Sequence, residues 1–361
     1  MLNNITGYME EYDHENLVVC QHKETGLKAF IAIHDTTLGP AVGGCRMWPY
    51  QAEEEAIEDA LRLGRGMTYK YAAAGVNLGG GKAVIMGDPA EDKSEALFRA
   101  LGRFIDRLGG AYYTGLDSGT ALQDMEYIHQ ETGYVVTLPA YLGGAGPISP
   151  YTARSTILGM KASLQELTGD SSLQGKKIAL QGAGDVGYNV IKYLAEEEVS
   201  EITITDIDEQ RIRKVIADFG TKVKIRTVAP DSIYDTPCDI FSPCALGAII
   251  NRDTVDRLQC KAIAGSANNQ LKEDEDGERL KQKGILYAPD FIVNAGGTIY
   301  DTDRIIYGSH NHERARKNVE AVYDKISLVF KISREENVVP HSAAEILARR
   351  RIEAYKQIKI L

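Results

Sequence analysis

The segment KKIALQGAGDVG, residues 176–187, decides the fold of the second half of the chain. Residues 176–181 predict a buried strand that runs directly into the pattern G-x-G-x-x-G. A helix is expected to follow to about residue 197, and a second strand over residues 202–205 ends at Asp206. The glycine pattern alone is a weak signal, but strand, glycines, helix, strand and terminal acid in this order indicate a dinucleotide-binding βαβ unit.

Each glycine of this pattern has an expected role. Gly182 makes the tight turn, Gly184 lets a pyrophosphate approach the backbone, and Gly187 lets helix and strand pack closely, while the helix N-terminus holds the phosphates. Asp206 would bond the ribose hydroxyls and repel a 2′-phosphate, which favours NAD over NADP. The alternative is a glycine-rich turn in an α/β domain that binds no dinucleotide. The predicted cofactor contacts of this unit are Gly182, Gly184, Asp185, Val186, Gly187, Asp206 and Ile207.

Three further short strands are predicted downstream, over residues 238–242, 261–264 and 285–288. Each is followed by small or polar residues. In a doubly wound sheet, ligands bind at the carboxyl ends of the strands, so these loops should frame the cofactor. Cys244 and Ala245, in the first of these loops, are therefore candidate cofactor contacts.

A second glycine-rich stretch, VNLGGGKAVIMGDP at residues 76–89, contains Lys82 between three glycines and an apolar run that predicts a buried strand. A lysine held there is partly desolvated. Desolvation lowers the pKa of the ammonium group, which allows a lysine to act as a base near neutral pH. The alternative is a glycine turn that carries a solvated lysine.

The rest of the first half predicts an α/β domain around this stretch. Asp117 follows a strand and lies between glycines, so it is either a turn-former or a positioned acid. Lys70 is expected at the end of a helix, beside the glycine loop. The predicted elements are a two-stranded hairpin within 17–34, an anion-approachable loop at 39–46, helices over 53–71 and 94–108, and a strand at 111–114.

Composition limits the partners. The formal net charge of −10 argues against nucleic acid or an anionic membrane. No apolar run approaches the roughly 20 residues that span a bilayer, and the N-terminal residues lack a signal-peptide pattern. Five scattered cysteines without CxxC spacing suit reduced thiols in a cytoplasm, and residues 310–312 are too short a histidine cluster to indicate a metal. We expect a cytoplasmic protein with no metal, membrane or nucleic-acid partner.

Residues 139–150, PAYLGGAGPISP, are the clearest break in composition along the chain. We therefore expect a substrate-binding and catalytic domain over residues 1–140, against which helices at about 325–361 pack back. The dinucleotide-binding domain is expected over residues 145–324, and two charged helices are expected after about Glu313.

Segments along nearly the whole chain resemble the glutamate/leucine/phenylalanine/valine dehydrogenase family. Within that family, the resemblance is greatest to the NAD-dependent phenylalanine and leucine dehydrogenases. The resemblance implies an N-terminal α/β domain and a Rossmann-type domain with the active site in the cleft between them, and a homo-oligomer, a dimer or octamer. The segments are HDTTLGPA (34–41), GMTYK (66–70), GGGKAVI (79–85), the Asp117 loop, SPCALGAIIN (242–251), AGSANNQLK (264–272) and YAPDFIVNAGG (287–297).

The resemblance also implies residue roles. Lys82 would hold or activate the water that attacks an iminium, Asp117 would exchange protons with the amino group, and Lys70 would bind the substrate α-carboxylate. Hydride would pass from the Cα of an L-amino acid to NAD, leaving ammonia and a 2-oxo acid. The implied substrate neighbours are Val42, Gly43, Gly44, Gly115, Leu116, Asn268, Thr298 and Asp301, and further cofactor contacts are Thr152, Asn269 and Asn294.

Some positions depart from the family pattern. Gly115-Leu116 and the third glycine before Lys82 favour an aromatic substrate pocket. Thr298 and Asp301 stand where the family usually has Val or Leu and then Val, and a carboxylate in an apolar pocket costs several kcal/mol unless it is paired. Either Asp301 points away or the substrate carries a polar or basic group. Arg154 is a further departure, where the family prefers an aromatic residue.

Two alternatives to an amino-acid dehydrogenase remain. One is an NAD-binding homologue that lost turnover and acts as a regulator or scaffold, against which Lys70, Lys82 and Asp117 argue. The other is a hydroxy-acid dehydrogenase, which lacks a candidate histidine because His34 and His129 lie in no matching context.

Overall fold

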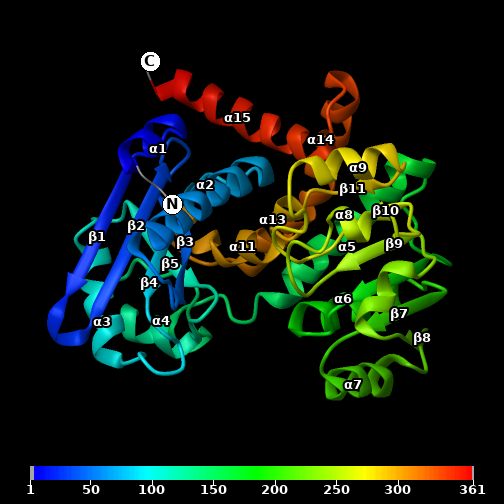
Figure 1. The fold of residues 1–361 in the computed structure, drawn as a ribbon, viewed down its shortest axis with the longest axis horizontal. Coiled ribbons are helices and arrows are strands. Elements are labelled where there is room, and N and C mark those ends of the chain that lie inside the picture. The colour runs from blue at the N-terminus through cyan, green and yellow to red at the C-terminus, as the bar shows by residue number, and fades with distance from the viewer. Residues whose placement is uncertain (1–3, 360–361) are drawn as a thin grey trace. The chain divides into compact units, whose positions relative to one another are not determined.

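The computed structural model describes residues 4–359, which form two compact units that divide between Gly146 and Pro147 (Figure 1). The first unit comprises the chain up to Gly146, residues Asp301–His310 and the chain from Ala348 onward. The second comprises Pro147–Tyr300 and Asn311–Leu347. Helices at about 325–361 were expected to pack with the first domain. The part of this region from Ala348 belongs to the first unit, and the part before Ala348 belongs to the second.

The first unit is built on a five-stranded sheet in the order β1-β2-β4-β3-β5. Strands β1 and β2 form the predicted hairpin, β2 and β4 are antiparallel, and β4, β3 and β5 are mutually parallel. The strands are β1 (Asn16–His22), β2 (Leu27–Asp35), β3 (Ala41–Trp48), β4 (Gly79–Met86) and β5 (Tyr112–Leu116).

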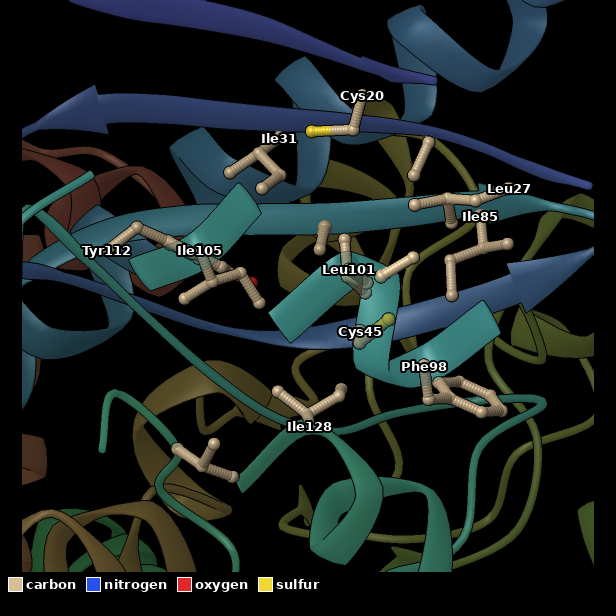
Figure 2. Packing of buried hydrophobic residues seen from close by; sticks show 14 of the residues in the cluster. Cys20, Leu27, Ile31, Cys45, Ile85, Phe98, Leu101, Ile105, Tyr112 and Ile128 are labelled. Carbon is tan, nitrogen blue, oxygen red and sulfur yellow. The ribbon is translucent and has the colours of Figure 1, made fainter. Parts of the chain in front are cut away.

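Helices cover both faces of this sheet. On one face, Phe98, Leu101 and Ile105 of α3 pack against strand residues such as Ile31 and Cys45 (Figure 2). The apolar face of α2 covers the other side, against β2 and β4. The helices of this unit up to Gly146 are α1 (Ile5–Glu11), α2 (Glu53–Ala74), α3 (Glu95–Asp106) and α4 (Leu122–His129), with 3-10 turns η1 (Lys23–Thr25) and η2 (Ala140–Leu142).

Two segments predicted as glycine loops are instead interior strands. A methyl group at Gly43 on β3 would lie 1.7 Å from the carbonyl oxygen of Gly81 on β4, and one at Gly80 would lie 2.0 Å from the backbone nitrogen of Thr68 on α2. The glycines therefore allow backbones to approach one another inside the sheet. Helix α2 also continues to Ala74, so Lys70 lies within it rather than at its end.

The second unit contains a six-stranded, wholly parallel sheet in the order β11-β10-β9-β6-β7-β8. This confirms the predicted Rossmann-type fold. Strand β8 and helix α7 were not predicted. The KIRT segment of β8 is largely exposed and lacks an apolar run. The strands are β6 (Lys177–Gln181), β7 (Glu201–Thr205), β8 (Lys224–Thr227), β9 (Ile240–Pro243), β10 (Ala262–Ile263) and β11 (Leu286–Tyr287).

The chain ends in three helices rather than the two predicted. Asn337 adopts a left-handed conformation (φ 53°) that ends α14, and Pro340 begins the last helix. Among the described residues, no helix combines the length and hydrophobicity that crossing a membrane requires. The helices from α5 on are α5 (Ser149–Thr168), α6 (Asp185–Glu196), α7 (Glu209–Phe219), α8 (Arg252–Val255), α9 (Glu275–Gln282), α10 (Asp290–Val293), α11 (Gly296–Asp301), α12 (Asp303–Tyr307), α13 (His312–Glu320), α14 (Val322–Glu336) and α15 (Pro340–Lys359), with the 3-10 segment η3 (Pro230–Asp235).

Candidate functional site

Lys82 and Asp117 form an ion pair in the first unit. Lys82 comes from β4, and Asp117 follows the end of β5. The lysine side chain is only 7% exposed and the aspartate 20%. The structure therefore brings together two residues that lie far apart in the sequence, and it largely removes the amine from water.

The electrostatics of this pair suit proton exchange. Burial lowers the pKa of the Lys82 ammonium, and the neighbouring Asp117 carboxylate opposes that shift only in part. Burial by itself would raise the pKa of Asp117, but the cations of Lys82 and Arg46 hold it below its usual value. The result is an ionised carboxylate beside an amine that gives up its proton more readily than a solvated lysine does.

Arg46 is a member of this cluster that the sequence analysis missed. Its Nε lies 3.3 Å from Asp117 Oδ2, the oxygen that Lys82 also approaches. Its Nη1 donates to Asp59 on α2 at 2.8 Å. Arg46 lies two residues after Gly44, so strand alternation places both on one face of β3. The sequence predicts a loop at residues 39–46, and a loop has no alternation of side chains that would place Arg46 beside Gly44.

The glycines expected near the substrate lie beside Asp117. A methyl group at Gly44 would lie 2.8 Å from the Cβ of Asp117, and Gly44 pairs with Gly115 across β3 and β5. Leu116 is the last residue of β5, and Val42, on β3, is buried. Half-buried Lys70 lies in α2, the helix packed on Lys82's strand.

Asp301, in α11, is buried and faces the end of β5. Its Oδ2 accepts a hydrogen bond from the Thr137 hydroxyl at 3.0 Å. That hydroxyl lies 2.9 Å from the point where a methyl group at Gly115 would stand. Burial raises the pKa of Asp301 to about 6, although Thr137 and the Arg304 cation oppose the shift. Thr137 was not predicted from the sequence because no motif marks it. Thr298, the other departure near Asp301 in the sequence, is half-buried and belongs to the second unit.

The glycine turn of the second unit fits a dinucleotide phosphate. Gly182 has a φ of +96°, and a methyl group at Gly187 would lie 2.0 Å from the carbonyl oxygen of Gly182. At Gly184, by contrast, the nearest atom to an added methyl is Arg211 Nη1, at 3.5 Å. Gly184 is the N-cap of α6, followed by Asp185 and Val186. The turn is therefore closed against protein on two sides and open at the helix N-terminus, where anions bind.

Asp206 orders this turn. Its Oδ2 accepts a hydrogen bond from the backbone N–H of Ala183 at 2.7 Å, and its Oδ1 accepts one from the N–H of Asp208 at 2.8 Å. Each carboxylate oxygen has a second lone pair, so the group can still accept a hydrogen bond from a sugar hydroxyl. Ile207 is 92% exposed.

The strand-end loops place some predicted cofactor contacts at the turn. A methyl group at Gly182 would lie 2.7 Å from the Cβ of Ala245, so the Cys244-Ala245 loop lies against the glycine turn. In the next loop, Asn294 donates a hydrogen bond to the side chain of Asn268 at 2.7 Å. The adjacent Asn269 is exposed, with a φ of 50°.

Thr152 and Arg154 lie in α5, each with a local partner. The Thr152 hydroxyl donates to the carbonyl of Ile148 at 3.5 Å and lies against Gly297. Arg154 makes two hydrogen bonds of 2.7 Å to Glu320 on α13. The departure at Arg154 is thus accommodated by an ion pair inside the second unit.

No cluster of three or more His, Cys, Asp or Glu side chains suited to a metal ion occurs within residues 4–359. Two histidines of the short cluster have separate partners: His310 faces Asp303 at 3.9 Å, and His312 hydrogen-bonds the Tyr300 hydroxyl.

A Rossmann-type sheet with an open glycine turn, and a separate unit holding a buried lysine–aspartate pair, define a dehydrogenase. Family models match both halves: "Glu/Leu/Phe/Val dehydrogenase, dimerisation domain" matches residues 14–134, and "Glutamate/Leucine/Phenylalanine/Valine dehydrogenase" matches residues 143–357. The chain belongs to this family.

Named relatives agree with this assignment. Leucine dehydrogenase of Thermoactinomyces intermedius is 54% identical over 98% of this chain and 95% of the relative. Phenylalanine dehydrogenase of the same organism is 43% identical over 99% and 96%. The crystal structure of L-tryptophan dehydrogenase from Nostoc punctiforme matches with a TM-score of 0.86 and 41% identity, covering 98% of this chain and 99% of that one.

The chain is therefore an amino-acid dehydrogenase, an oxidoreductase, as the sequence predicted, and not the inactive alternative. The family implies a nicotinamide cofactor. At lower identity, the hetero-hexameric glutamate dehydrogenase of Thermus thermophilus shares the fold, with 20% identity and a TM-score of 0.77 over 96% of this chain and 90% of that one.

Proposed function

We propose that this protein oxidatively deaminates an L-amino acid with NAD, giving the 2-oxo acid, ammonia and NADH, and that it catalyses the reverse reductive amination. The observation that carries the proposal is the buried Lys82–Asp117 pair. An amine that is 7% exposed and bonded to a carboxylate is poised to exchange protons with a bound substrate.

The residues of the first unit divide the chemistry. Lys70 and the backbone N–H groups near Gly43 and Gly44 bind the substrate carboxylate. Asp117 takes a proton from the substrate ammonium, so that the Cα–H bond can break with its electron pair. A nicotinamide cofactor would supply the acceptor for that hydride. Lys82 then takes a proton from the water that adds to the iminium carbon. Asp117 returns its proton to the nitrogen, the C–N bond breaks with its electron pair so that ammonia leaves, and the hydroxyl proton passes to water as the carbonyl forms.

The proposed cofactor is NAD. Open space above Gly184 at the α6 N-terminus suits a pyrophosphate. Asp206, an anion already fixed by two backbone N–H groups, favours ribose hydroxyls and disfavours a 2′-phosphate. We assign Asp185, Val186, Ile207, Cys244, Ala245, Thr152, Asn269 and Asn294 to the same cofactor, and Asn268 to the substrate amine.

Two observations bear on the substrate side chain. The two Thermoactinomyces enzymes differ in identity to this chain, 54% for leucine against 43% for phenylalanine dehydrogenase, which favours a branched aliphatic substrate. Gly115 and Leu116 instead favour a larger, aromatic one. If the buried Asp301, three residues after Thr298, lines the substrate pocket, it would favour a substrate whose side chain carries a hydrogen-bond donor.

We further propose a cytoplasmic homo-oligomer. The N-terminal family model is described as a dimerisation domain, and the five cysteines are free, as suits a reducing compartment. Whether the assembly is a dimer or an octamer follows from light scattering of the purified chain.

The test is NADH formation at alkaline pH with NAD and a panel of aliphatic, aromatic and basic L-amino acids. Turnover on at least one is expected, and Lys82→Ala should lower it by about 10³-fold or more. Lys93→Ala is the matched control, because Lys93 also pairs with an aspartate, Asp124 at 2.5 Å, but does not touch Asp117. No turnover on any amino acid, or full activity of Lys82→Ala, would overturn the proposal.

A further inference from the structure

One carboxylate oxygen in the first unit serves two cations. Lys82 and Arg46 both approach Oδ2 of Asp117, the arginine at 3.3 Å. If Lys82 were the only cation there, the carboxylate would hold the lysine proton firmly. A second, permanently charged group at the same oxygen weakens that hold and repels the ammonium directly.

Arg46 is kept in place from its other side. Its Nη1 donates to Asp59 Oδ2 at 2.8 Å, and the Tyr50 hydroxyl donates to the same oxygen at 2.5 Å. Arg62 donates to the other oxygen of Asp59 at 2.8 Å, from a side chain that is 54% exposed. The guanidinium therefore spans two carboxylates, one beside the reacting amine and one on α2.

Arg46 lines a cavity of about 560 Å³, and Lys82 is not among the residues that line it. The cavity is lined by Arg46, Trp48, Tyr50, Glu55, Glu58, Asp59, Arg62 and Ser118. Ser118 follows Asp117 directly. Removal of the arginine would leave Asp117 with Lys82 as its one ion-pair partner among the described residues.

We propose that Arg46, held by Asp59, is a positioning residue that sets the pH at which Lys82 becomes neutral, by sharing the Asp117 carboxylate. The inference rests on the proposed function of Lys82 and Asp117 as the proton-exchanging pair. Arg46 itself takes up and releases no proton in the proposed reaction. It acts through the carboxylate that it shares with the lysine.

Other titratable groups near the pair do not account for such a pH dependence. Burial raises the pKa of Cys45, Tyr50 and Tyr112 further from neutrality, so these groups stay protonated over the assay range. The charged groups that face the cluster from its surroundings are Glu55, Glu58, Asp59 and Arg62 on α2, Lys93 before α3, and Asp124 on α4.

The test is the pH profile of kcat/KM for the best substrate of the panel. Arg46→Gln should move the alkaline-rising limb to higher pH by about one unit, because Lys82 keeps its proton longer. Arg46→Lys should restore part of that shift, and Asp59→Asn should give a smaller shift in the same direction. Arg62→Gln, which removes an exposed cation from Asp59 without touching Asp117, should leave the profile unchanged.

A second readout does not depend on turnover. Acetic anhydride acetylates only the neutral form of a lysine, so the pH dependence of Lys82 acetylation relative to a reference amine, followed by peptide mass spectrometry, reports its protonation. The midpoint should move up in Arg46→Gln even if the proposed reaction is wrong. An unchanged midpoint, or a uniform loss of activity with no shift in the profile, would overturn the inference. If Arg46→Gln fails to fold, Asp59→Asn and Tyr50→Phe carry the same test.

Discussion

The two glycine-rich stretches look alike in the sequence but do opposite work. In the first unit, Gly80 and Gly43 lie inside strands, and their missing side chains are replaced by backbone atoms of neighbouring elements at 2.0 and 1.7 Å from where a methyl would stand. In the second unit, Gly184 faces open space, with its nearest neighbour at 3.5 Å. Gly43 and Gly80 make room for neighbouring backbone, whereas Gly184 leaves space open at the helix N-terminus.

This difference separates the two units energetically. In the first, the groups assigned to catalysis lie in the same packed sheet that stabilises the unit, so a change there affects stability and activity together. In the second, the position assigned to the pyrophosphate is Gly184 at the N-terminus of α6, where no protein atom lies closer than 3.5 Å to an added methyl group. Substitutions whose effects on unfolding free energy and on NAD affinity are measured separately test this contrast directly.

Gly43→Ala should have the largest effect. The added methyl would clash with the carbonyl of Gly81 at 1.7 Å, and neither backbone can move without breaking the β3–β4 pairing. We expect a loss of at least about 3 kcal/mol of unfolding free energy, together with loss of activity. Urea unfolding followed by circular dichroism measures it.

Gly66→Ala in the same unit is the matched control. Gly66 lies in the interior of α2, is exposed, and has no atom within 4 Å of an added methyl. Alanine there should stabilise the helix by about 0.5–1 kcal/mol. Equal effects of the two substitutions would refute the close approach of β3 and β4.

The next largest effect is expected at the cofactor turn, where two alanines should behave oppositely. Gly184→Ala should weaken NAD binding about tenfold or more with thermal stability unchanged, because the methyl occupies the space for the pyrophosphate. Gly187→Ala should destabilise the unit instead, since its methyl would lie 2.0 Å from a backbone oxygen. Calorimetric titration with NAD and thermal melts of both variants measure this. A stability loss in Gly184→Ala would contradict an open face at that position.

Much of the second unit could be predicted because its signals are local. A strand, a turn and a helix that adjoin in sequence carry the glycine pattern, and Asp206 follows one strand later. The position of the Cys244 loop beside Gly182 could be predicted because, in a parallel sheet, the loops at the carboxyl ends of the strands lie together. The strand that was missed, β8, is short and largely exposed, so it has no hydrophobic signal to detect.

The first unit was predicted less well because its signals are tertiary. Local preference makes Gly43 and Gly80 turn residues, and only the approach of another backbone makes them strand residues. The Arg46–Asp117 contact then depends on knowing that β3 is a strand, and the Thr137–Asp301 contact joins residues 164 positions apart. Lys82 and Asp117 were candidates from their local sequence context, and a family resemblance supplied their roles, while the cluster that surrounds them was not predicted.

The last prediction concerns Asp301, a buried carboxylate in the first unit. Its pKa is raised to about 6, chiefly by burial, from an unfolded value near 4. A group whose pKa is raised by folding binds its proton more tightly in the folded state. Its contribution to stability is therefore full below about pH 4 and is lost as the pH rises through about 6.

Asp301→Asn removes that titration and should make the protein more stable than the wild type at pH 8, by about 1 kcal/mol, but not at pH 4.5. The gain is modest because the new amide must also find a partner beside Thr137. Urea unfolding of both proteins at the two pH values measures it, with Thr137→Val as a companion that removes the donor and should raise the pKa further. If the variant's advantage is the same at both pH values, Asp301 is not the titrating group. If Asp301→Asn also changes which amino acids of the panel are oxidised, the carboxylate lines the substrate pocket, and the contrast between the units sharpens: in the first, one buried group would set both stability and specificity.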